Sequence, residues 1–230
     1  MNQDFKTCKC KDCELKELFF ENVRDNELAN ICKLKQENTY FKGEDIINEG
    51  EEIKYFMYLK EGLVKLYRNA GNRDQIITFA GPLDFVSILS VFSDSNFNYS
   101  VTALEDSVVC CLDINTVKQI ASQNSNFAMG LLKKMSTLSD NIIKTVLDIR
   151  RKNLRGRIAY VLIYFADEVY KKPSFDLPVS RKEIAEMIEM TTENVIRILS
   201  EFRKDGILKI FGKTIEVIEM ERLKRICNFG

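Results

Sequence analysis

Apolar residues recur with a helical period in the C-terminal third of the chain. After Thr191 they follow one another at i, i+3, i+4 and i+7, which predicts a helix whose buried face is formed by Val195, Ile198, Leu199 and Phe202. A shorter helix is predicted just before it, because Ser180 and Glu183 have the spacing of a capping box. Asp205-Gly206 ends the second helix, since glycine accepts the left-handed conformation that closes a helix.

Two short runs rich in β-forming residues follow these helices, at 207–210 and 214–218. They are joined through Phe211-Gly212-Lys213, so a β-hairpin is predicted there. A short helix, a tight turn, a second helix and a hairpin, in this order and at these lengths, are typical of a winged helix-turn-helix.

The side of the second helix opposite its apolar stripe is largely polar. Glu193 and Arg197 lie one turn apart on it, and arginine can bind guanine while glutamate can accept a hydrogen bond from cytosine. The alternative is an ordinary i,i+4 ion pair on a helix that only packs against its own domain. The helix-turn-helix order favours a helix that enters the major groove of DNA. The outward face comprises Thr192, Glu193, Ile196, Arg197 and Ser200.

The N-terminal half has a different pattern. Short helices are predicted at 14–20 and 25–33, and short β-like runs separated by glycine and polar residues follow. Many short strands at near-regular spacing predict an antiparallel β-roll or jelly roll. The strands are expected at 38–41, 45–48, 55–60, 62–68, 74–80, 98–105 and 107–112.

The longest helical pattern covers residues 126–153. Its apolar residues are spaced by four and three, close to a heptad seam, which predicts a dimerisation helix. The alternative is a helix packed on its own β-roll, and Leu132 and Ile143 broaden the apolar face enough for one helix to serve both contacts. The predicted seam is Phe127, Leu131, Met135, Leu138, Ile142, Thr145 and Ile149.

These elements predict an α+β protein in three parts. Residues 1–125 form a cysteine-containing segment and the β-roll, and residues 126–153 form the long helix and a hinge. Residues 154–230 form the winged helix-turn-helix domain, with further helices at 154–170 and 220–227.

Motifs in both halves resemble the Crp/Fnr family of bacterial transcription regulators. In the C-terminal half they are Ser180-Arg181-Lys182-Glu183-Ile184-Ala185, Thr192-Glu193-Asn194-Val195-Ile196-Arg197 and Gly212-Lys213-Thr214-Ile215. In the N-terminal half, Phe41-Lys42-Gly43-Glu44 and Leu59-Lys60-Glu61-Gly62 are similar to the cyclic-nucleotide-binding fold. The resemblance implies a homodimeric, DNA-binding regulator of transcription whose N-terminal β-roll is a sensor.

The resemblance also implies which residues touch DNA. Arg197 is expected to contact guanine and Glu193 the complementary cytosine in a near-palindromic site, with half-sites containing TGA. Thr192 stands where the cyclic-AMP-responsive members carry another base-reading arginine, so the outer bases are not predicted. RNA polymerase is a further partner that a regulator of this type implies. Positioning contacts are expected from Thr191, Thr192 and Ser200, and phosphate contacts from Arg181 and Lys213.

The residues expected of a cyclic-nucleotide pocket are missing. Ile88 stands where the family's ribose-binding glutamate lies, and Phe97-Asn98 stand in place of its Arg-Ser pair. No Arg or Lys occurs between Arg73 and Lys118, and a buried phosphate without a counter-charge is costly. Cyclic AMP is therefore not the expected ligand, and the signal is left unidentified.

Three cysteines, Cys8, Cys10 and Cys13, cluster near the N-terminus. Such a cluster can bind a metal or an iron–sulfur cluster, or act as a redox switch; idle, reduced thiols are the favoured interpretation. The resemblance sharpens the alternative, because Cys10, Cys13 and Cys110 match cysteines that hold a [4Fe–4S] cluster in the oxygen-sensing branch. The remaining ligand would fall near Phe19, which cannot coordinate iron, and Cys8 has the wrong spacing.

Charge is unevenly distributed although the formal net charge is zero. Residues 150–230 hold 17 Lys and Arg against 12 Asp and Glu, whereas residues 1–149 hold 17 against 22. A basic C-terminal part fits a domain that faces phosphates. No apolar run approaches the ~20 residues that span a bilayer, and the N-terminus lacks the apolar core of a signal peptide, so a cytoplasmic protein without a membrane partner is expected.

The chain contains no histidine, which excludes catalytic triads, zinc sites and acid–base schemes that need one. The sequence also offers no nucleophile–base pair, phosphate loop or metal triad, so an enzyme is not predicted. The rival from another class is a ligand-gated module whose helix-turn-helix packs on a protein partner instead of DNA.

Overall fold

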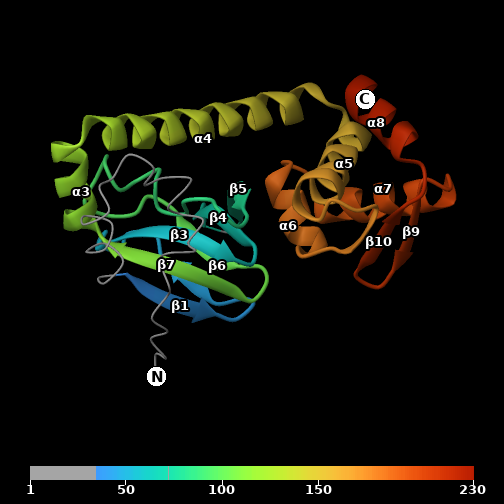
Figure 1. Ribbon diagram of the computed structural model, residues 1–230. Coiled ribbons are helices and arrows are strands. Elements are labelled where there is room, and N and C mark those ends of the chain that lie inside the picture. The colour runs from blue at the N-terminus through green and yellow to red at the C-terminus, as the bar shows by residue number, and fades with distance from the viewer. Residues whose placement is uncertain (1–34, 72) are drawn as a thin grey trace. The chain divides into compact units, whose positions relative to one another are not determined.

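The computed structural model of the protein describes residues 35–71 and 73–230 (Figure 1). Its internal contacts divide the described chain into two compact units. The first contains residues up to 69 together with 77–140, and the second contains 70–76 and 141–230. The helices predicted at 14–20 and 25–33 lie outside the described residues.

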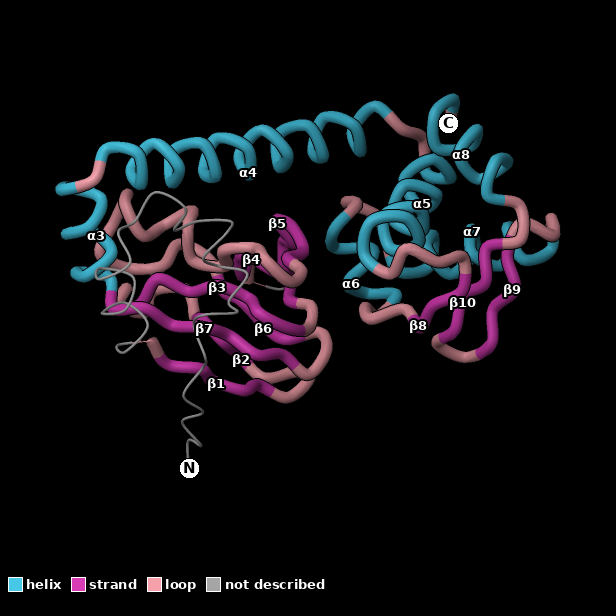
Figure 2. The backbone as a smooth tube through the Cα atoms, viewed as in Figure 1, coloured by secondary structure: helices cyan, strands magenta, loops and turns pink. Residues whose placement is uncertain are grey.

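Antiparallel strands build the N-terminal half (Figure 2). One sheet has the order β1-β7-β3, from β1 (Gln36–Tyr40), β7 (Ser107–Asp113) and β3 (Tyr55–Glu61). The other has the order β2-β6-β4-β5, from β2 (Asp45–Ile47), β6 (Ser100–Ala103), β4 (Val64–Asn69) and β5 (Asp74–Ala80). Strand β7 pairs antiparallel with β1 and β3, and β6 with β2 and β4. The predicted antiparallel N-terminal sheets are confirmed.

The core of this half is apolar and aromatic. Phe56 of β3 is fully buried, and its ring centroid lies 5.0 Å from that of Phe85. The hydroxyl of Tyr99 donates to the backbone carbonyl of Val86 at 2.9 Å, so this buried phenol is hydrogen-bonded. Other members of the core include Ile47, Leu59, Val64, Leu66, Ile88, Val101 and Val109.

The turn between β3 and β4 requires a glycine. Gly62 has φ +96°, and a Cβ placed on it would lie 2.2 Å from Ser107 Oγ and 2.7 Å from the carbonyl oxygen of Asp106. Both the backbone conformation and the close approach of the neighbouring strand therefore exclude a side chain at this turn.

Helix α3 (Ile114–Gln123) follows β7 and was not predicted. Its N-cap is Asp113, whose side chain accepts a hydrogen bond from the backbone N–H of Thr116 at 2.8 Å. An Asp before a stretch of helically spaced apolar residues is a known N-cap signal, so Asp113 is the feature of the sequence that predicts this helix.

The long helix is α4 (Ser125–Arg151), close to its predicted range. Most of the predicted seam packs inward in the single chain, and its Ile142 and Thr145 are half-buried. Phe127 and Leu131 are buried in the β-roll core, Met135 and Leu138 pack against that core, and Ile149 is buried near the other end of the helix. The alternative, a helix packed on its own β-roll, therefore holds for the first part of this face, and dimerisation through α4 stays a prediction.

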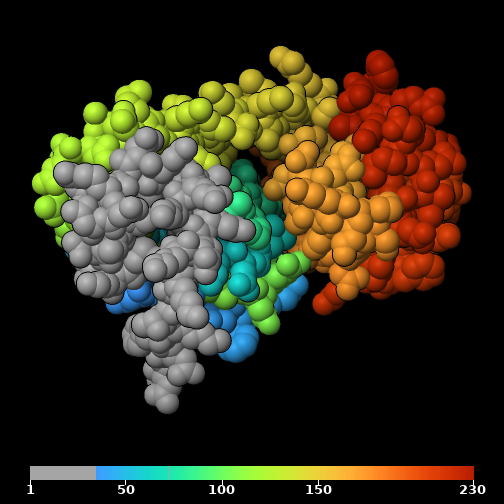
Figure 3. All heavy atoms as spheres, in the orientation of Figure 1, coloured from blue at the N-terminus to red at the C-terminus, as the bar shows by residue number. Residues whose placement is uncertain are grey.

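A different face of α4 is exposed and apolar. Leu132 is 53% exposed and Ile143 is 57% exposed, whereas helices that merely cover a core turn polar residues outward. The other members of this exposed face are Met129, Val146 and Leu147. Atoms of α4, yellow-green to yellow, lie at the surface of the face shown in Figure 3.

The second unit is a three-stranded sheet with helices. Helix α5 (Leu154–Ile163) continues as the π-helix η2 (Tyr164–Val169), within the single helix predicted at 154–170. Strand β8 (Ser174–Asp176), which was not predicted, adds to the hairpin of β9 (Leu208–Phe211) and β10 (Thr214–Val217) in the order β8-β10-β9. The remaining helices are α6 (Arg181–Met187), α7 (Thr192–Lys204) and α8 (Met220–Phe229).

None of the helices in the described residues is long and apolar enough to cross a membrane.

Candidate nucleic-acid interface

Helix α6 begins at the capping box that the sequence predicts. The backbone N–H of Glu183 donates to Ser180 Oγ at 3.1 Å, and the backbone N–H of Ser180 donates to the Glu183 carboxylate at 2.8 Å. The helix ends at Ile188, and Glu189 takes a positive φ of 53° in the turn that follows. A tight turn therefore separates the two helices, as the sequence predicts.

Helix α7 has one buried and one exposed side. Thr191 is its N-cap and accepts a hydrogen bond from the backbone N–H of Asn194 at 3.3 Å. Asp205 and Gly206 end the helix as predicted, with Gly206 at φ +74°. The predicted stripe of Val195, Ile198, Leu199 and Phe202 is buried, at 0–3% exposure. Its opposite side carries Glu193, Ile196 and Arg197, all exposed.

Arg197 pairs forward along the helix. Its Nη1 lies 2.5 Å from Glu201 Oε1, and its Nη2 donates to Asn194 Oδ1 at 3.3 Å. The i,i+4 pair with Glu193 that the spacing offered as an alternative is not the contact that forms. Glu201 also accepts from Arg155 Nη1 at 2.8 Å, so it links the exposed arginine of α7 to α5.

The Glu193 carboxyl group is exposed near the start of α7. Its own backbone N–H and then the side chain of Thr191 donate hydrogen bonds to it, which lowers the pKa of this carboxyl below its usual value. It is therefore a carboxylate at neutral pH, and a carboxylate accepts hydrogen bonds without donating any. The exocyclic amino group of a nucleic-acid base is a suitable hydrogen-bond donor to such an acceptor.

The other predicted contacts surround this helix. Thr192 and Ser200 are half-buried at its edges, and the Ser200 hydroxyl donates to the carbonyl of Ile196 at 2.9 Å. Arg181, at the start of α6, is also half-buried, and burial lowers the pKa of its guanidinium. Lys213 is exposed at the turn of the β9–β10 hairpin.

The hairpin is held to the rest of its unit through β8. The Thr214 hydroxyl donates to Asp176 Oδ1 at 2.6 Å, and the backbone N–H of Leu177 donates to the carbonyl of Lys213 at 3.0 Å. Phe211, the last residue of β9 before the Gly212-Lys213 turn, is 65% exposed. The predicted wing is therefore a supported hairpin with a cation and an aromatic ring at its tip.

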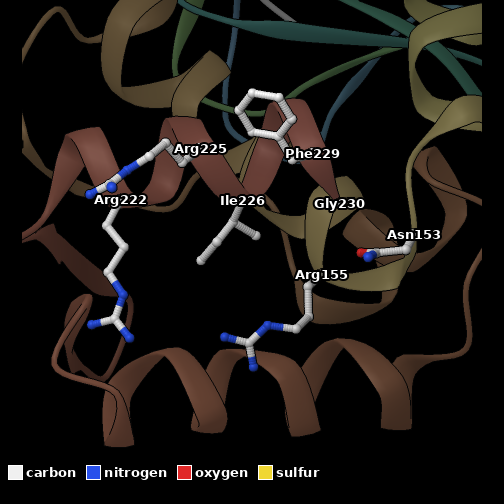
Figure 4. Close-up of a pocket in the computed structure, with 7 residues that line it drawn as sticks. All are labelled: Asn153, Arg155, Arg222, Arg225, Ile226, Phe229 and Gly230. Carbon is white, nitrogen blue, oxygen red and sulfur yellow. The ribbon is translucent and has the colours of Figure 1, made fainter.

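Arginines from α5 and α8 line an open pocket of about 440 Å³ (Figure 4). Arg155 is held by Glu201 and Asp205, each at 2.8 Å, and Arg222 by the Asp205 carbonyl at 3.1 Å. Arg225, Ile226 and Phe229 complete much of the lining. Because two of these arginines already have acceptors, the pocket is not the concentrated positive site that a free anion needs.

The region that matches a nucleotide pocket is occupied by the protein core. Ile88 is 1% exposed and Phe97 is also buried. Ser87 is fully buried, and its Oγ accepts from the backbone N–H of Met57 at 2.7 Å. These side chains do not supply the charged contacts that a cyclic phosphate requires.

Of the cysteines predicted as cluster ligands, Cys110 lies within the described residues. It is buried in β7, while Cys8, Cys10 and Cys13 lie outside the described residues. Among residues 35–71 and 73–230, no group of three or more Cys, Asp or Glu side chains could hold a metal ion. The described residues alone therefore do not form a metal site.

Two features of the interface were missed in the sequence. Glu201 follows Arg197 by four residues, the spacing that allows an ion pair, but the expected partner is Glu193, which precedes Arg197 by the same distance. Ile196 is expected on the outward face, but no contact with DNA is predicted for it. An exposed isoleucine among polar side chains is a pattern that can indicate a binding residue.

Comparisons with known proteins agree with this architecture. Residues 37–124 match the cyclic nucleotide-binding domain family, and residues 156–226 match the Crp-like helix-turn-helix domain family. The fumarate and nitrate reduction regulatory protein of Yersinia pestis is 27% identical, over 95% of this chain and 90% of that protein. The protein of the same name from Escherichia coli K12 is 26% identical with the same coverage.

Solved structures show the same fold. FixK2 from Bradyrhizobium japonicum superposes with a TM-score of 0.74 at 25% identity, covering 84% of this chain and 96% of that one. A protein from Eubacterium rectale, described as a transcriptional regulator of the Crp/Fnr family, has a TM-score of 0.79 at 16% identity, with 94% and 98% covered. With both domain matches in the order that its β-roll and winged helix-turn-helix require, the chain belongs to the Crp/Fnr family of transcription regulators.

Proposed function

We propose that this regulator binds a specific, near-palindromic DNA sequence as a homodimer and reads it with the outward face of α7. The observation that carries the proposal is that face itself. Glu193 and Arg197 are exposed on a helix whose opposite side is buried, so their polar groups face solvent while packing holds the helix in place. A rigid helix with exposed polar heads suits the major groove, which admits an α-helix.

Each of the two residues has a complementary base. Arg197 binds the O6 and N7 acceptors of guanine, and Glu193 accepts from the N4 amino group of the complementary cytosine. Each such contact is worth about 1–3 kcal/mol of discrimination against other bases. Around them, Thr191, Thr192 and Ser200 position the helix, and Arg181 and Lys213 contact phosphates.

Dimerisation doubles this small footprint. A single helix-turn-helix covers too little DNA for tight and specific binding, and two copies place their reading helices about 34 Å apart on successive turns. The exposed apolar face of α4, which includes Leu132 and Ile143, supports the dimer because an aliphatic stripe on a long helix is stabilised by a second copy.

The N-terminal β-roll senses a signal other than cyclic AMP. The buried Ile88 and Phe97 support this, since they stand where charged side chains would be needed to bind a cyclic nucleotide. An iron–sulfur cluster at the N-terminal cysteines is the alternative signal. Iron and sulfide analysis of anaerobically purified protein, with its visible spectrum, tests it; a colourless protein after anaerobic reconstitution would exclude it. RNA polymerase is the downstream partner.

Selection from a random duplex pool tests the DNA-binding proposal. The protein should enrich a two-fold symmetric motif, and Arg197→Ala should lose base choice at one G·C pair in each half-site while keeping it elsewhere. Uniform weakening on all sequences would make Arg197 a phosphate contact instead. If no sequence is enriched, the helix-turn-helix serves another partner, and the rival interaction module becomes the better explanation.

A further inference from the structure

Ile196 is an exposed isoleucine on the face of α7 that is otherwise polar. Its side chain is 52% exposed, whereas the apolar residues of the buried stripe, such as Val195 and Ile198, are fully buried. Single exposed apolar residues are common on protein surfaces, so exposure alone assigns no role. The position of Ile196 on the helix is what distinguishes it.

Positions 193, 196, 197 and 200 follow the i, i+3, i+4, i+7 pattern of one helical face. Ile196 therefore lies beside Glu193 and Ser200 on the surface of α7 and next to Arg197 in the chain. The Ser200 hydroxyl donates to the Ile196 carbonyl, so it bonds to the backbone without covering the isoleucine side chain from solvent. A helix that presents Glu193 and Arg197 to base edges must present Ile196 to the same groove.

The major groove offers one apolar group among its base edges, the C5-methyl group of thymine. Opposite cytosine, adenine or guanine, an aliphatic side chain would cover polar atoms without replacing their hydrogen bonds to water, which costs free energy. Opposite thymine, it buries a methyl group instead. The side chain thus favours one base over the other three.

We propose that Ile196 is a specificity-determining residue that packs on the 5-methyl group of a thymine in each half-site, near the G·C pair contacted by Glu193 and Arg197. This contact rests on the proposed function, since it requires α7 in the major groove. It adds to that function a preference that the polar residues cannot provide, because a hydrogen-bonding side chain does not detect the methyl group.

Replacing thymine by deoxyuridine tests the contact directly. The change removes the methyl group and keeps base pairing, so it can be made at each thymine of the selected duplex in both half-sites. Wild-type protein should lose about fourfold in affinity per half-site at one position, the effect of one lost methyl contact. With both half-sites changed, the loss should be roughly 16-fold if the two are independent.

Ile196→Ala completes a double-mutant cycle with the methyl group. The variant should bind the thymine duplex more weakly and should no longer distinguish thymine from deoxyuridine at that position. Alanine favours the helix, so the fold should be retained. Ile218→Ala removes a comparable side chain, 44% exposed and outside α7, and should keep the wild-type response to deoxyuridine.

The possible results separate the two proposals. A protein that selects no sequence overturns DNA reading, and the thymine contact with it. A protein that selects a motif but tolerates deoxyuridine at every position, or an Ile196→Ala variant that keeps the wild-type sensitivity, overturns the thymine contact and leaves DNA reading intact.

Discussion

The guanidinium group of Arg197 lies against the carboxylate of Glu201, with Nη1 and Oε1 2.5 Å apart. Glu201 is shared, since Arg155 Nη1 lies 2.8 Å from its other oxygen, and the Arg155 guanidinium lies over the ring of Phe202 at 4.8 Å. Without DNA, the proposed guanine-reading arginine is thus held by an acid that is itself anchored to α5. Binding to guanine requires Arg197 to exchange this partner.

Glu201→Gln should therefore strengthen specific DNA binding. An exposed i,i+4 ion pair is worth about 0.3–0.5 kcal/mol, so its loss should tighten binding to the selected duplex about twofold per half-site, or roughly fourfold for the dimer. Fluorescence anisotropy at constant salt, with the selected duplex and an unrelated one, measures the change. The gain should be larger on the selected duplex.

Glu221→Gln is the matched control, because it removes one exposed negative charge from α8 of the same unit. It should give no preference for the selected duplex. Equal gains from the two variants, or equal gains on the two duplexes, would show that Glu201 acts through net charge and not through its hold on Arg197.

Lys213→Ala should weaken binding to all sequences alike. The lysine is exposed at the wing tip, where it is proposed to neutralise one phosphate per subunit. Each phosphate contact contributes about 0.9 to the slope of log K against log salt, so a dimer should lose roughly two units and each half-site about one. Binding isotherms between low and moderate salt give the slope.

The control for the wing is Lys224→Ala. In the wild-type protein the ammonium of Lys224, on α8, lies 3.0 Å from the carboxylate of Asp167, on η2. This variant removes the same charge from a lysine that already has an acid partner, so the salt slope should stay at the wild-type value. An unchanged slope in Lys213→Ala would remove the wing lysine from the phosphate contacts.

The winged helix-turn-helix could be predicted because its signals are local. The capping box of Ser180 and Glu183, the apolar stripe of α7 and the stop at Gly206 each involve residues within one or two turns of one another. Such patterns depend little on the rest of the chain, and all three are confirmed. Strand β8 was missed because three residues become a strand only by pairing with the distant β10.

The two faces of α4 show where periodicity fails. A helix with apolar residues on more than one side contains several plausible seams, and spacing alone does not say which one meets its own domain. Phe127 and Leu131 fit the heptad pattern well but fill the β-roll core, which leaves Leu132 and Ile143 outward. Deciding between these faces requires the position of the sheets, which the sequence does not provide.

Burial of Cys111 should make the protein less stable at high pH. Burial raises the pKa of this thiol to about 12, opposed by a hydrogen bond from Asn38. The folded state therefore keeps the proton after the unfolded chain has lost it. The resulting stabilisation is complete below the unfolded pKa of about 8.5 and is lost as pH rises toward the folded pKa, by about 1.4 kcal/mol per unit.

Urea unfolding under reducing conditions between pH 8 and pH 10.5 measures this dependence. Between pH 9 and pH 10 the unfolding free energy of Cys111→Ala should fall by about 1 kcal/mol less than that of the wild-type protein. Val109→Ala, on the same buried strand, removes packing but no titrating group, so it should lower the whole curve and keep its slope. Equal slopes for wild type and Cys111→Ala would contradict the assignment.

Ile143→Asp should dissociate the proposed dimer. Ile143 is exposed on α4 in the single chain, and a second copy packed on this face would bury the introduced carboxylate without a partner. A penalty of at least about 2 kcal/mol corresponds to a dimerisation constant roughly 30-fold weaker.

Sedimentation equilibrium should show monomers, and affinity for the symmetric duplex should fall because each helix-turn-helix then binds alone. Lys144→Asp places a carboxylate about 100° further around the helix, on an exposed side chain, and should remain dimeric although it changes the net charge by one unit more. If Ile143→Asp stays dimeric, or if both variants dissociate equally, another surface holds the two copies together.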